Sequence, residues 1–269
     1  MLEPSRGLSP AALDAISALE QRVVAADGGR LKLEWGRLRD RAGDRVEDFL
    51  WWDGDRLVGF AGLYGFGDSV EVAGMVDPSA RGRGIGGGLL DAVLRETPQV
   101  LLIVPRASEA GKRLAERRGG VPDHSEHVME LRGDPVPGPS DPRVTLRPAV
   151  LSDLAAVASF LDEGFGSAIP DLDSRLGTFR MIERDGAVVG TLNVVSRDGR
   201  TAVSGFVVAR EHRGQGIGRQ VLREVCRSSP DSVVGLEVAV GNDHALGLYT
   251  SLGFVPILTE DYYAVRARD

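Results

Sequence analysis

The chain has 269 residues, of which 42% are hydrophobic and 26% are charged, and its net charge is −7. This composition predicts a globular protein with a substantial core, and the acidic excess argues against a nucleic-acid-binding surface, which needs a basic face. A single cysteine, Cys226, excludes an intrachain disulfide framework and fits a reducing cytoplasm, where we expect the protein to work. We see neither a run approaching the roughly 20 apolar residues of a membrane span nor a signal-peptide pattern.

The first half predicts a helix, a hairpin and a strand that runs into a glycine-rich loop. Ser9-Pro10 is typical of a helix start, and we expect this helix to run to Asp27. An Asp-Gly-Asp turn at 53–55 separates two strand-like runs and indicates a hairpin. Residues 71–90 then read as an apolar strand, the motif Arg-Gly-x-Gly-Ile-Gly and an apolar helix.

The second half repeats this pattern after a proline-rich stretch. Residues 134–142 hold four prolines without apolar periodicity, which is typical of a semi-rigid linker. A strand is expected at 144–147 and a helix from Ser152 or Asp153 to about Phe160. An Arg-Asp-Gly turn follows within a second hairpin, and residues 203–222 then repeat the strand, Arg-Gly-x-Gly-Ile-Gly and helix.

The spacing of the two copies predicts two similar domains. The motif recurs 132 residues later, from Arg81 to Arg213, which is far too long a period for a solenoid. We therefore divide the chain into a domain at 1–133, a linker at 134–142 and a domain at 143–269.

The glycine loops are suited to holding an anion. A helix that follows closely spaced glycines presents unpaired backbone N–H groups at its positive end, and glycines let a diphosphate approach closely. In the second copy, Arg213 and Arg219 add charge to this loop. A tight turn without a ligand is the simpler alternative, but two copies with the same spacing argue against it.

Other phosphate-binding motifs fit less well. Residues 82–87 satisfy G-x-G-x-x-G, but Arg219 replaces the last glycine in the second copy, and both loops follow antiparallel hairpins rather than opening a βαβ unit. A dinucleotide-dependent oxidoreductase is thus disfavoured. The absence of Gly-Lys-Ser/Thr excludes a P-loop NTPase. His124 and His127 have no companions at ligand spacing, so no metal site is expected.

The second half resembles the GCN5-related N-acetyltransferases (GNAT). The residues that carry the resemblance are Val208, Arg213 to Gly218, Leu222, Leu236-Glu237-Val238, Asn242, Ala245, Tyr249 and Leu252-Gly253-Phe254. It covers 143–269 strongly and 31–133 in the first motif only. It implies two tandem mixed α/β domains, each with a mostly antiparallel central sheet, splayed middle strands and flanking helices, and direct acetyl transfer from acetyl-CoA to an amine.

The resemblance also implies which residues bind the co-substrate acetyl-CoA. In the second copy these are Phe206, Val207, Val208, Arg213, Gly214, Gln215, Gly216, Ile217, Gly218, Arg219, Asn242 and Leu248. Backbone N–H groups near Val207 and Val208 would polarise the acetyl carbonyl. Asn242 would bind the pantetheine arm, or merely cap the next helix.

Glu237 and Tyr249 are the candidate catalytic residues. Aminolysis of a thioester needs a base for the amine and an acid for the departing thiolate. Glu237 faces opposite to its strand neighbours, and the same Glu-to-Tyr spacing of twelve occurs in family members that acetylate protein N-termini. There the resemblance makes Glu237 the base and Tyr249 the acid. Glu237 as a solvated strand residue, Tyr249 as a core residue and a water wire as base stay open.

The first copy keeps the loop but lacks the acid. On the corresponding register Tyr249 matches Ala115, and Glu237 matches Ile103. Glu71 complicates this reading, because many family members carry a catalytic glutamate at that strand position. We expect catalysis in 143–269 and a degenerate first domain. The loop of this domain is a possible second CoA site, whose residues are Met75, Val76, Arg81, Gly82, Arg83, Gly84, Ile85 and Gly86.

Charge is the sequence feature that bears on the acceptor amine. Acidic residues of the second domain, Asp162, Glu163, Asp171, Asp173 and the Glu260-Asp261-Tyr262-Tyr263 segment, would attract a cationic small-molecule or peptide amine, or are simply solvated. A non-catalytic CoA-binding sensor is the alternative from another class. Mycothiol-synthase-like acetyltransferases are a further alternative, on architecture alone. No nucleic-acid or membrane partner is expected, and monomer and homodimer both stay open.

Overall fold

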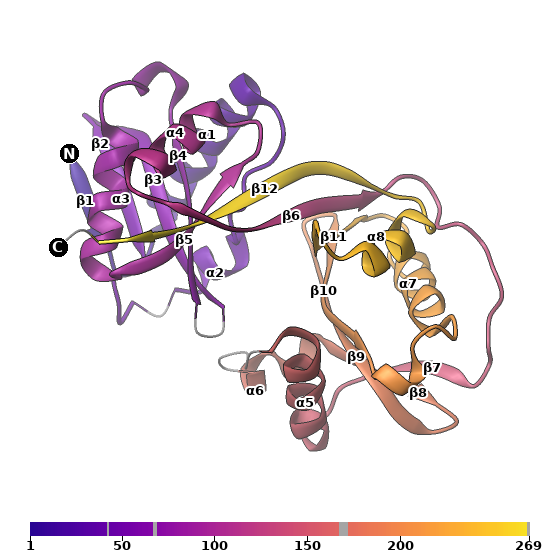
Figure 1. Ribbon diagram of the computed structural model, residues 1–269. Coiled ribbons are helices and arrows are strands. Elements are labelled where there is room, and N and C mark those ends of the chain that lie inside the picture. The colour runs from indigo at the N-terminus through magenta and orange to yellow at the C-terminus, as the bar shows by residue number, and fades with distance from the viewer. Residues whose placement is uncertain (42, 67–68, 167–171, 268–269) are drawn as a thin grey trace. The chain divides into compact units, whose positions relative to one another are not determined.

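A computed structural model describes residues 1–41, 43–66, 69–166 and 172–267 (Figure 1). The chain forms two compact units, unit 1 from Met1–Ser125 with Leu258–Asp269 and unit 2 from Glu126–Ile257. Each is a mixed, mostly antiparallel sheet with helices on both faces, which confirms the predicted fold class. Within the described ranges, no helix is long and apolar enough to cross a membrane.

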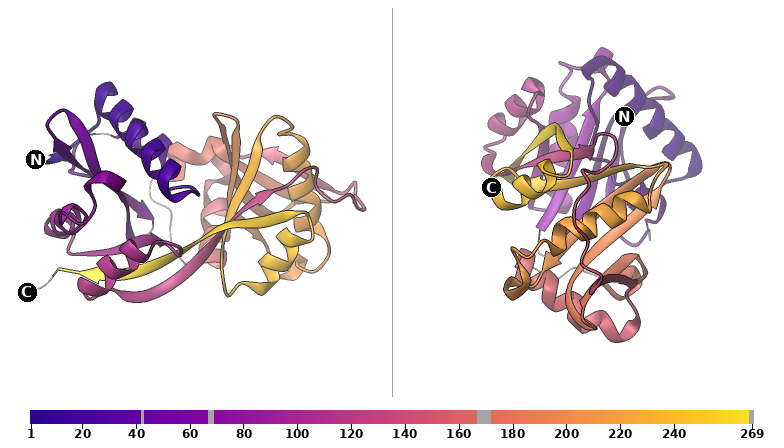
Figure 2. Two further views of the ribbon diagram at one scale, coloured as in Figure 1. Left: turned by 90° about the horizontal axis from the view of Figure 1, so that it is seen from above. Right: turned by 90° about the vertical axis from the view of Figure 1, so that its right-hand side faces the viewer.

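The described strands of unit 1 pair side by side in a sheet. The strand order is β1 (Leu2–Ser5), β2 (Asp48–Asp53), β3 (Arg56–Phe66), β4 (Ser69–Val76), β5 (Gln99–Pro105) and β12 (Phe254–Arg266). Among the described residues of this unit, β4 and β5 are the strands that pair in parallel. Helices α3 (Ile85–Glu96) and α4 (Glu109–Arg117) pack on one face, and α1 (Pro10–Asp27) and α2 (Trp35–Arg39) on the other (Figure 2).

Unit 2 repeats this plan. Its strand order is β6 (Val121–Leu131), β11 (Val233–Ala239), β10 (Arg200–Val208), β9 (Ala187–Arg197), β8 (Phe179–Arg184) and β7 (Val144–Pro148). Here β10 and β11 are the parallel pair. Helices α7 (Ile217–Arg227) and α8 (Asp243–Thr250) cover one face, and α5 (Leu154–Phe165) and the short α6 (Leu172–Arg175) the other.

The two sequence copies exchange their last strands. β6, from the first copy, pairs with β11 in unit 2, and β12, from the second copy, pairs with β5 in unit 1. Val128 lies opposite Glu237 in unit 2, just as Tyr262 lies opposite Ile103 in unit 1. The compact units thus differ from the two sequence copies. The boundary at 134–142 separates the sequence copies and stays a prediction about them.

Local signals in the sequence form most of the expected elements. Ser9 caps α1 by accepting a hydrogen bond from the Ala12 N–H at 3.1 Å, and Gly28 ends the helix at a φ of +73°. Asp185 and Gly186 both have positive φ, as a two-residue hairpin turn requires. Helix α5 continues through Gly164 to Phe165, beyond the expected end near Phe160, and ends at Gly166, whose φ is +67°.

The proline-rich stretch is fastened to α7. The buried guanidinium of Arg223 donates to the carbonyl oxygens of Val136 at 3.1 Å and Pro139 at 2.9 Å. A Cβ on Gly138 would come within 2.3 Å of this guanidinium, so glycine is needed for the close approach. Burial lowers the pKa of Arg223.

Candidate functional site

In each unit the two parallel strands part after a short ladder. β10 pairs with β11 from Arg200 to Val203, and β4 pairs with β5 only at Glu71 and Val72. Among the described residues both ladders end there, so the later residues of β10 and β4 lie unpaired on that side. This matches the splayed middle strands that the family resemblance implies.

A bulge distinguishes β10 from β4. The register between β10 and β9 shifts between Ser204 and Val207, and Gly205 within the shift has a φ of +55°. A bulge turns backbone groups out of the ladder and re-aims them. The corresponding ladder of β4 with β3 is continuous from Ser69 to Val76. Sequence reasoning missed this difference, although Gly205, which aligns with Ala73, was a signal for it.

Both glycine loops adopt the same conformation. Gly214 and Gly216 have φ of +74° and +82°, and Gly82 and Gly84 have φ of +77° and +81°. A Cβ at any of these positions would meet nothing within 4 Å, so the space above each loop is open. Gly216 is the N-cap of α7 and offers no capping side chain, which leaves the first N–H groups of that helix available to an anion.

The motif arginine fastens the loop to the strand end. In unit 2 the Arg213 Nε–H donates to the Val208 carbonyl at 2.7 Å, and the guanidinium pairs with Glu163 of α5 at 3.0 Å. In unit 1 Arg81 repeats both contacts, with the Val76 carbonyl at 3.2 Å and with Asp27 of α1 at 2.6 Å. Hydrogen bonds from Arg81 lower the pKa of Asp27. Sequence reasoning assigned the arginine to the anion and did not foresee this clamp.

The other predicted loop residues in unit 2 gather around the start of α7. A Cβ on Gly218 would touch Phe206 and Leu248 at 3.4 Å, so these two apolar side chains lie beside the first helical turn. Ile217 is buried in the core, and Val207 is buried on the opposite face of the sheet against Gly164 of α5.

The polar loop residues bond within the unit. Gln215 accepts a hydrogen bond from Arg184 and donates to the Glu211 carbonyl at 3.1 Å. Arg219 donates to the Ser251 hydroxyl at 3.1 Å.

The glycine loop of unit 1 resembles that of unit 2 but places its arginine differently. Met75 and Ile85 are buried, and Gly86 faces Val76 and Leu114 as Gly218 faces Phe206 and Leu248. Arg83 lies 3.6 Å from Asp53. Gly87 stands where unit 2 has Arg219, and the Arg118 guanidinium fills the space that a Cβ there would need, 2.8 Å away.

Tyr249 lies in α8 with its ring in the core of unit 2. Its exposed fraction is 8%, and its ring centroid is 6.1 Å from that of Phe254. Burial raises the pKa of its hydroxyl to about 12. The phenol therefore stays protonated at neutral pH, as a proton donor must.

Glu237 lies on the other face of the same sheet. Its neighbours Leu236 and Val238 are buried with Tyr249 in the core below α7 and α8, and alternation along β11 places the half-buried Glu237 on the face that α5 covers. A group that passed between the parted strands β10 and β11 would meet a carboxylate on one side and a phenol on the other.

Asn242 and Ser108 occupy equivalent helix starts. The Asn242 side-chain oxygen accepts from the Ala245 N–H at 3.1 Å and caps α8, and Ser108 likewise accepts from the Gly111 N–H at 3.2 Å and caps α4. The Asn242 amide NH₂ is not used in this cap. The match supports the register on which Tyr249 corresponds to the fully buried Ala115.

The acceptor residues expected for the second domain are only partly there. Glu260 to Tyr263 pair with β5 and belong to unit 1, so they do not join the acidic residues of α5 and α6 in unit 2 as expected. The physical reason is the strand exchange, which sequence periodicity does not reveal. Asp171 lies outside the described residues. Asp162 and Glu163 lie on α5, and Asp173 on α6.

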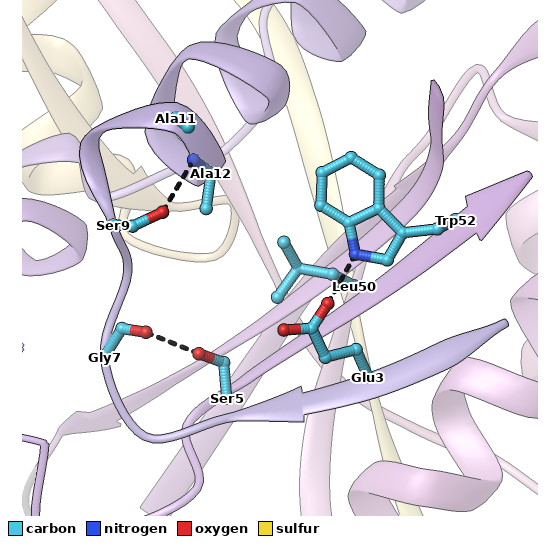
Figure 3. A pocket seen from close by; sticks show the side chains of 8 residues that line it. All are labelled: Glu3, Ser5, Gly7, Ser9, Ala11, Ala12, Leu50 and Trp52. Atoms are coloured by element: carbon cyan, nitrogen blue, oxygen red, sulfur yellow. Dashed lines mark hydrogen bonds between the residues drawn. The ribbon is translucent and has the colours of Figure 1, made fainter. Parts of the chain in front are cut away.

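Metal-ligating clusters and pockets are the other places where a ligand site could lie. No group of three or more metal-ligating side chains occurs in the part of the chain that is described. A pocket of roughly 250 Å³ lies in unit 1 beside the start of α1, lined by Glu3, Ser5, Gly7, Ser9, Ala11, Ala12, Leu50 and Trp52 (Figure 3). Its polar groups serve the fold, since the Trp52 indole donates to Glu3 at 2.7 Å and Ser9 caps the helix.

Comparisons with known proteins agree with this geometry. The model of the acetyltransferase (GNAT) family matches residues 17–119 and 151–254. The mycothiol acetyltransferase of Kytococcus sedentarius is 42% identical over 125 residues, which are 46% of this chain and 40% of that protein. The match thus spans less than half of that relative.

Solved structures share the tandem fold. A GCN5-related N-acetyltransferase from Sphaerobacter thermophilus aligns with a TM-score of 0.77 at 22% identity, over 100% of this chain and 96% of that one. A tandem GNAT protein from the clavulanic acid biosynthesis pathway aligns with a TM-score of 0.68 at 20% identity, over 100% and 99%.

Proposed function

Because this chain belongs to the acetyltransferase (GNAT) family, we propose that it transfers the acetyl group of acetyl-CoA to a primary amine by direct attack, with the chemistry in unit 2. The observation that carries the assignment to unit 2 is the combination of the β10 bulge with Tyr249. Unit 1 has a continuous β4 ladder, and Ala115 stands where unit 2 has its phenol.

The residues present fit an acyl-CoA. Open space above Gly214 and Gly216 and the uncapped start of α7 suit a diphosphate, and Phe206 and Leu248 beside Gly218 suit the less polar arm that follows. Acetyl-CoA supplies the activated acyl group as a thioester. The Arg213 clamp holds the end of β10 against the loop, so that the strand and the anion site keep a fixed distance.

Each protein group has one task in the proposed reaction. Glu237 accepts the proton of the attacking amine. The backbone N–H of Val208, in β10 next to the bulge, donates to the acetyl oxygen as negative charge develops there. Tyr249 gives its proton to the departing sulfur, and its raised pKa of about 12 keeps that proton in place until the sulfur needs it.

A mycothiol-type acceptor is the second, narrower candidate. It is favoured by the 42% identity to a protein named mycothiol acetyltransferase, over less than half of that protein's length. The exposed carboxylates of Asp162 on α5 and Asp173 on α6 suit a cationic amine in general.

A thiol-release assay tests both levels of the proposal. Acetyl-CoA is incubated with the protein and a panel of amines: the deacetylated form of mycothiol, amino sugars, polyamines and peptides with free N-termini. Release of free CoA only when an acceptor is present supports the transferase. Tight acetyl-CoA binding without release for any acceptor would instead support a non-catalytic CoA-binding protein.

A further inference from the structure

Unit 1 holds a buried amine between a carboxylate and a phenol. Lys32, in the segment between α1 and α2, is only 8% exposed, and its Nζ lies 3.7 Å from Oε2 of Glu71 on β4. The same Nζ donates a hydrogen bond to the Tyr262 hydroxyl of β12 and lies 5.1 Å from the centre of that ring. His124 stacks on the Tyr262 ring, with ring centroids 4.1 Å apart.

The arrangement lies over the point where the strands of unit 1 part. Glu71 forms one of the two pairs that join β4 to β5, and Tyr262 lies opposite Ile103 on the other side of β5. Both side chains are on the α1 face, with Ile103 and Met75 of the same core cluster. Lys32 therefore spans β5 and brings a nitrogen nucleophile to the end of the β4–β5 ladder.

We propose that Lys32 is a self-acetylation site, and that it occupies the acceptor position of unit 1 as an internal amine. This inference rests on the proposed function, since acetyl-CoA held at the Gly82–Gly84 loop is the donor. Unit 1 then has both a base and a phenol. Glu71 provides the base, and Tyr262, which reaches unit 1 through the strand exchange, provides a phenol on the α1 face of the sheet, whereas Ala115 lies on the α4 face.

The step balances with the groups present. The Lys32 ammonium gives one proton to Glu71, and the neutral amine attacks the thioester carbonyl. An N–C bond forms, the C–S bond breaks and the electron pair leaves with sulfur. Tyr262, which accepts the N–H of Lys32, takes the second nitrogen proton as it gives its own to the thiolate. The products are N-acetyl-Lys32 and CoA, and one proton passes to solvent through Glu71.

The reaction is expected to be slow and to occur once. The ladder of β4 lacks the bulge that re-aims the β10 backbone in unit 2, so the developing oxyanion has fewer donors. The acetylated side chain also stays in place, since it belongs to the chain.

The sequence supplies its own control. Lys112 is the other of the chain's two lysines; its side chain is 29% exposed against 7% for Lys32, and it lies 3.2 Å from Glu109 on the surface of α4. Uncatalysed acetylation favours the exposed amine. Preferential acetylation of the buried one requires assistance from its surroundings.

The experiment follows both lysines by peptide mass spectrometry during incubation of the full chain with acetyl-CoA. We expect acetylation of Lys32 at least tenfold faster than that of Lys112, at a rate independent of protein concentration, and unchanged in Tyr249→Phe. Glu71→Gln should slow it by about a hundredfold, the low end for a general base. Tyr262→Phe, which keeps the ring stacked on His124, should slow it as well and carries the test if Glu71→Gln does not fold.

Several outcomes overturn the inference. These are equal acetylation rates at the two lysines, no acetylation of Lys32 while Lys112 reacts, a rate of Lys32 acetylation that rises with protein concentration, and loss of Lys32 acetylation in Tyr249→Phe. CoA release with an external amine separates the two proposals: if that turnover is normal and Lys32 stays unmodified, self-acetylation fails while the proposed function stands.

Discussion

Replacing Tyr249 by phenylalanine removes the proposed acid and little else. The ring is 8% exposed and packs against Phe254, and phenylalanine keeps this packing. Among the described residues the hydroxyl forms no hydrogen bond, so its loss should change the free energy of unfolding by less than about 0.5 kcal/mol. A general acid contributes roughly 10²–10⁴-fold, so we expect kcat to fall by at least about a hundredfold, or about 2.7 kcal/mol in the barrier.

The pH dependence sharpens this prediction. Burial raises the pKa of Tyr249 from 10.0 to about 12, so the wild-type acid stays protonated through pH 10 and kcat should not decline there from loss of this proton. The folded-state pKa lies above the unfolded one, so the associated stability is complete below pH 10 and is lost between pH 10 and 12. The variant should lack this loss.

The assay is steady-state CoA release with a saturating amine, combined with thermal unfolding of each variant. Tyr263→Phe is the matched control, because Tyr263 is a partly buried phenol on β12 and has no proposed role in unit 2. Full activity in a folded Tyr249→Phe protein would refute the assignment of the acid.

The remaining predictions concern the fold. A chain that ends after Ile257 would lose the strand that pairs with β5, including the buried side chains of Tyr262 and Val265. Each buried side chain contributes about 2 kcal/mol or more, and a ladder of backbone hydrogen bonds is lost as well, so unit 1 should unfold while hydrogen exchange in unit 2 stays slow. Uniform protection of both units would contradict the strand exchange. Asp153→Asn should remove a contribution to the free energy of unfolding that depends on acid pH. Hydrogen bonds from Arg147 lower the pKa of Asp153 from 3.8 to about 2, so the stabilisation by Asp153 is lost as pH falls between these values. The free energy of unfolding, measured across this pH range, should therefore change less in the variant than in the wild type.

The glycine loops and hairpins are predictable because their signals are local. Positive φ at Gly214, Gly216 and Gly186 follows from turns that only a residue without Cβ adopts easily, and the sequence spacing repeats it in both copies. The helix start at Ser9-Pro10 is local in the same way. Such features need no knowledge of what the segment packs against.

The strand exchange could not be predicted from the same sequence. β6 and β12 each follow the last helix of their own copy, and nothing local in either segment specifies which of the two sheets it completes. The position of Tyr262 beside Lys32 and Glu71 depends on that choice, since these residues are far apart in the chain and come together only in the folded unit 1. The Arg213 clamp was missed for a related reason, because Glu163 lies on α5, fifty residues earlier.

The central claim is that the glycine loop of unit 2, and not that of unit 1, presents the acyl donor for acetylation of an external amine. Gly216→Val and Gly84→Val form a matched pair, because the two glycines have φ of +82° and +81° and each is the N-cap of its helix. Measured as kcat/KM for amine acetylation by the folded variants, the account predicts a loss of more than about tenfold for Gly216→Val and a value near wild type for Gly84→Val. The reverse order, or equal losses in both, would contradict it.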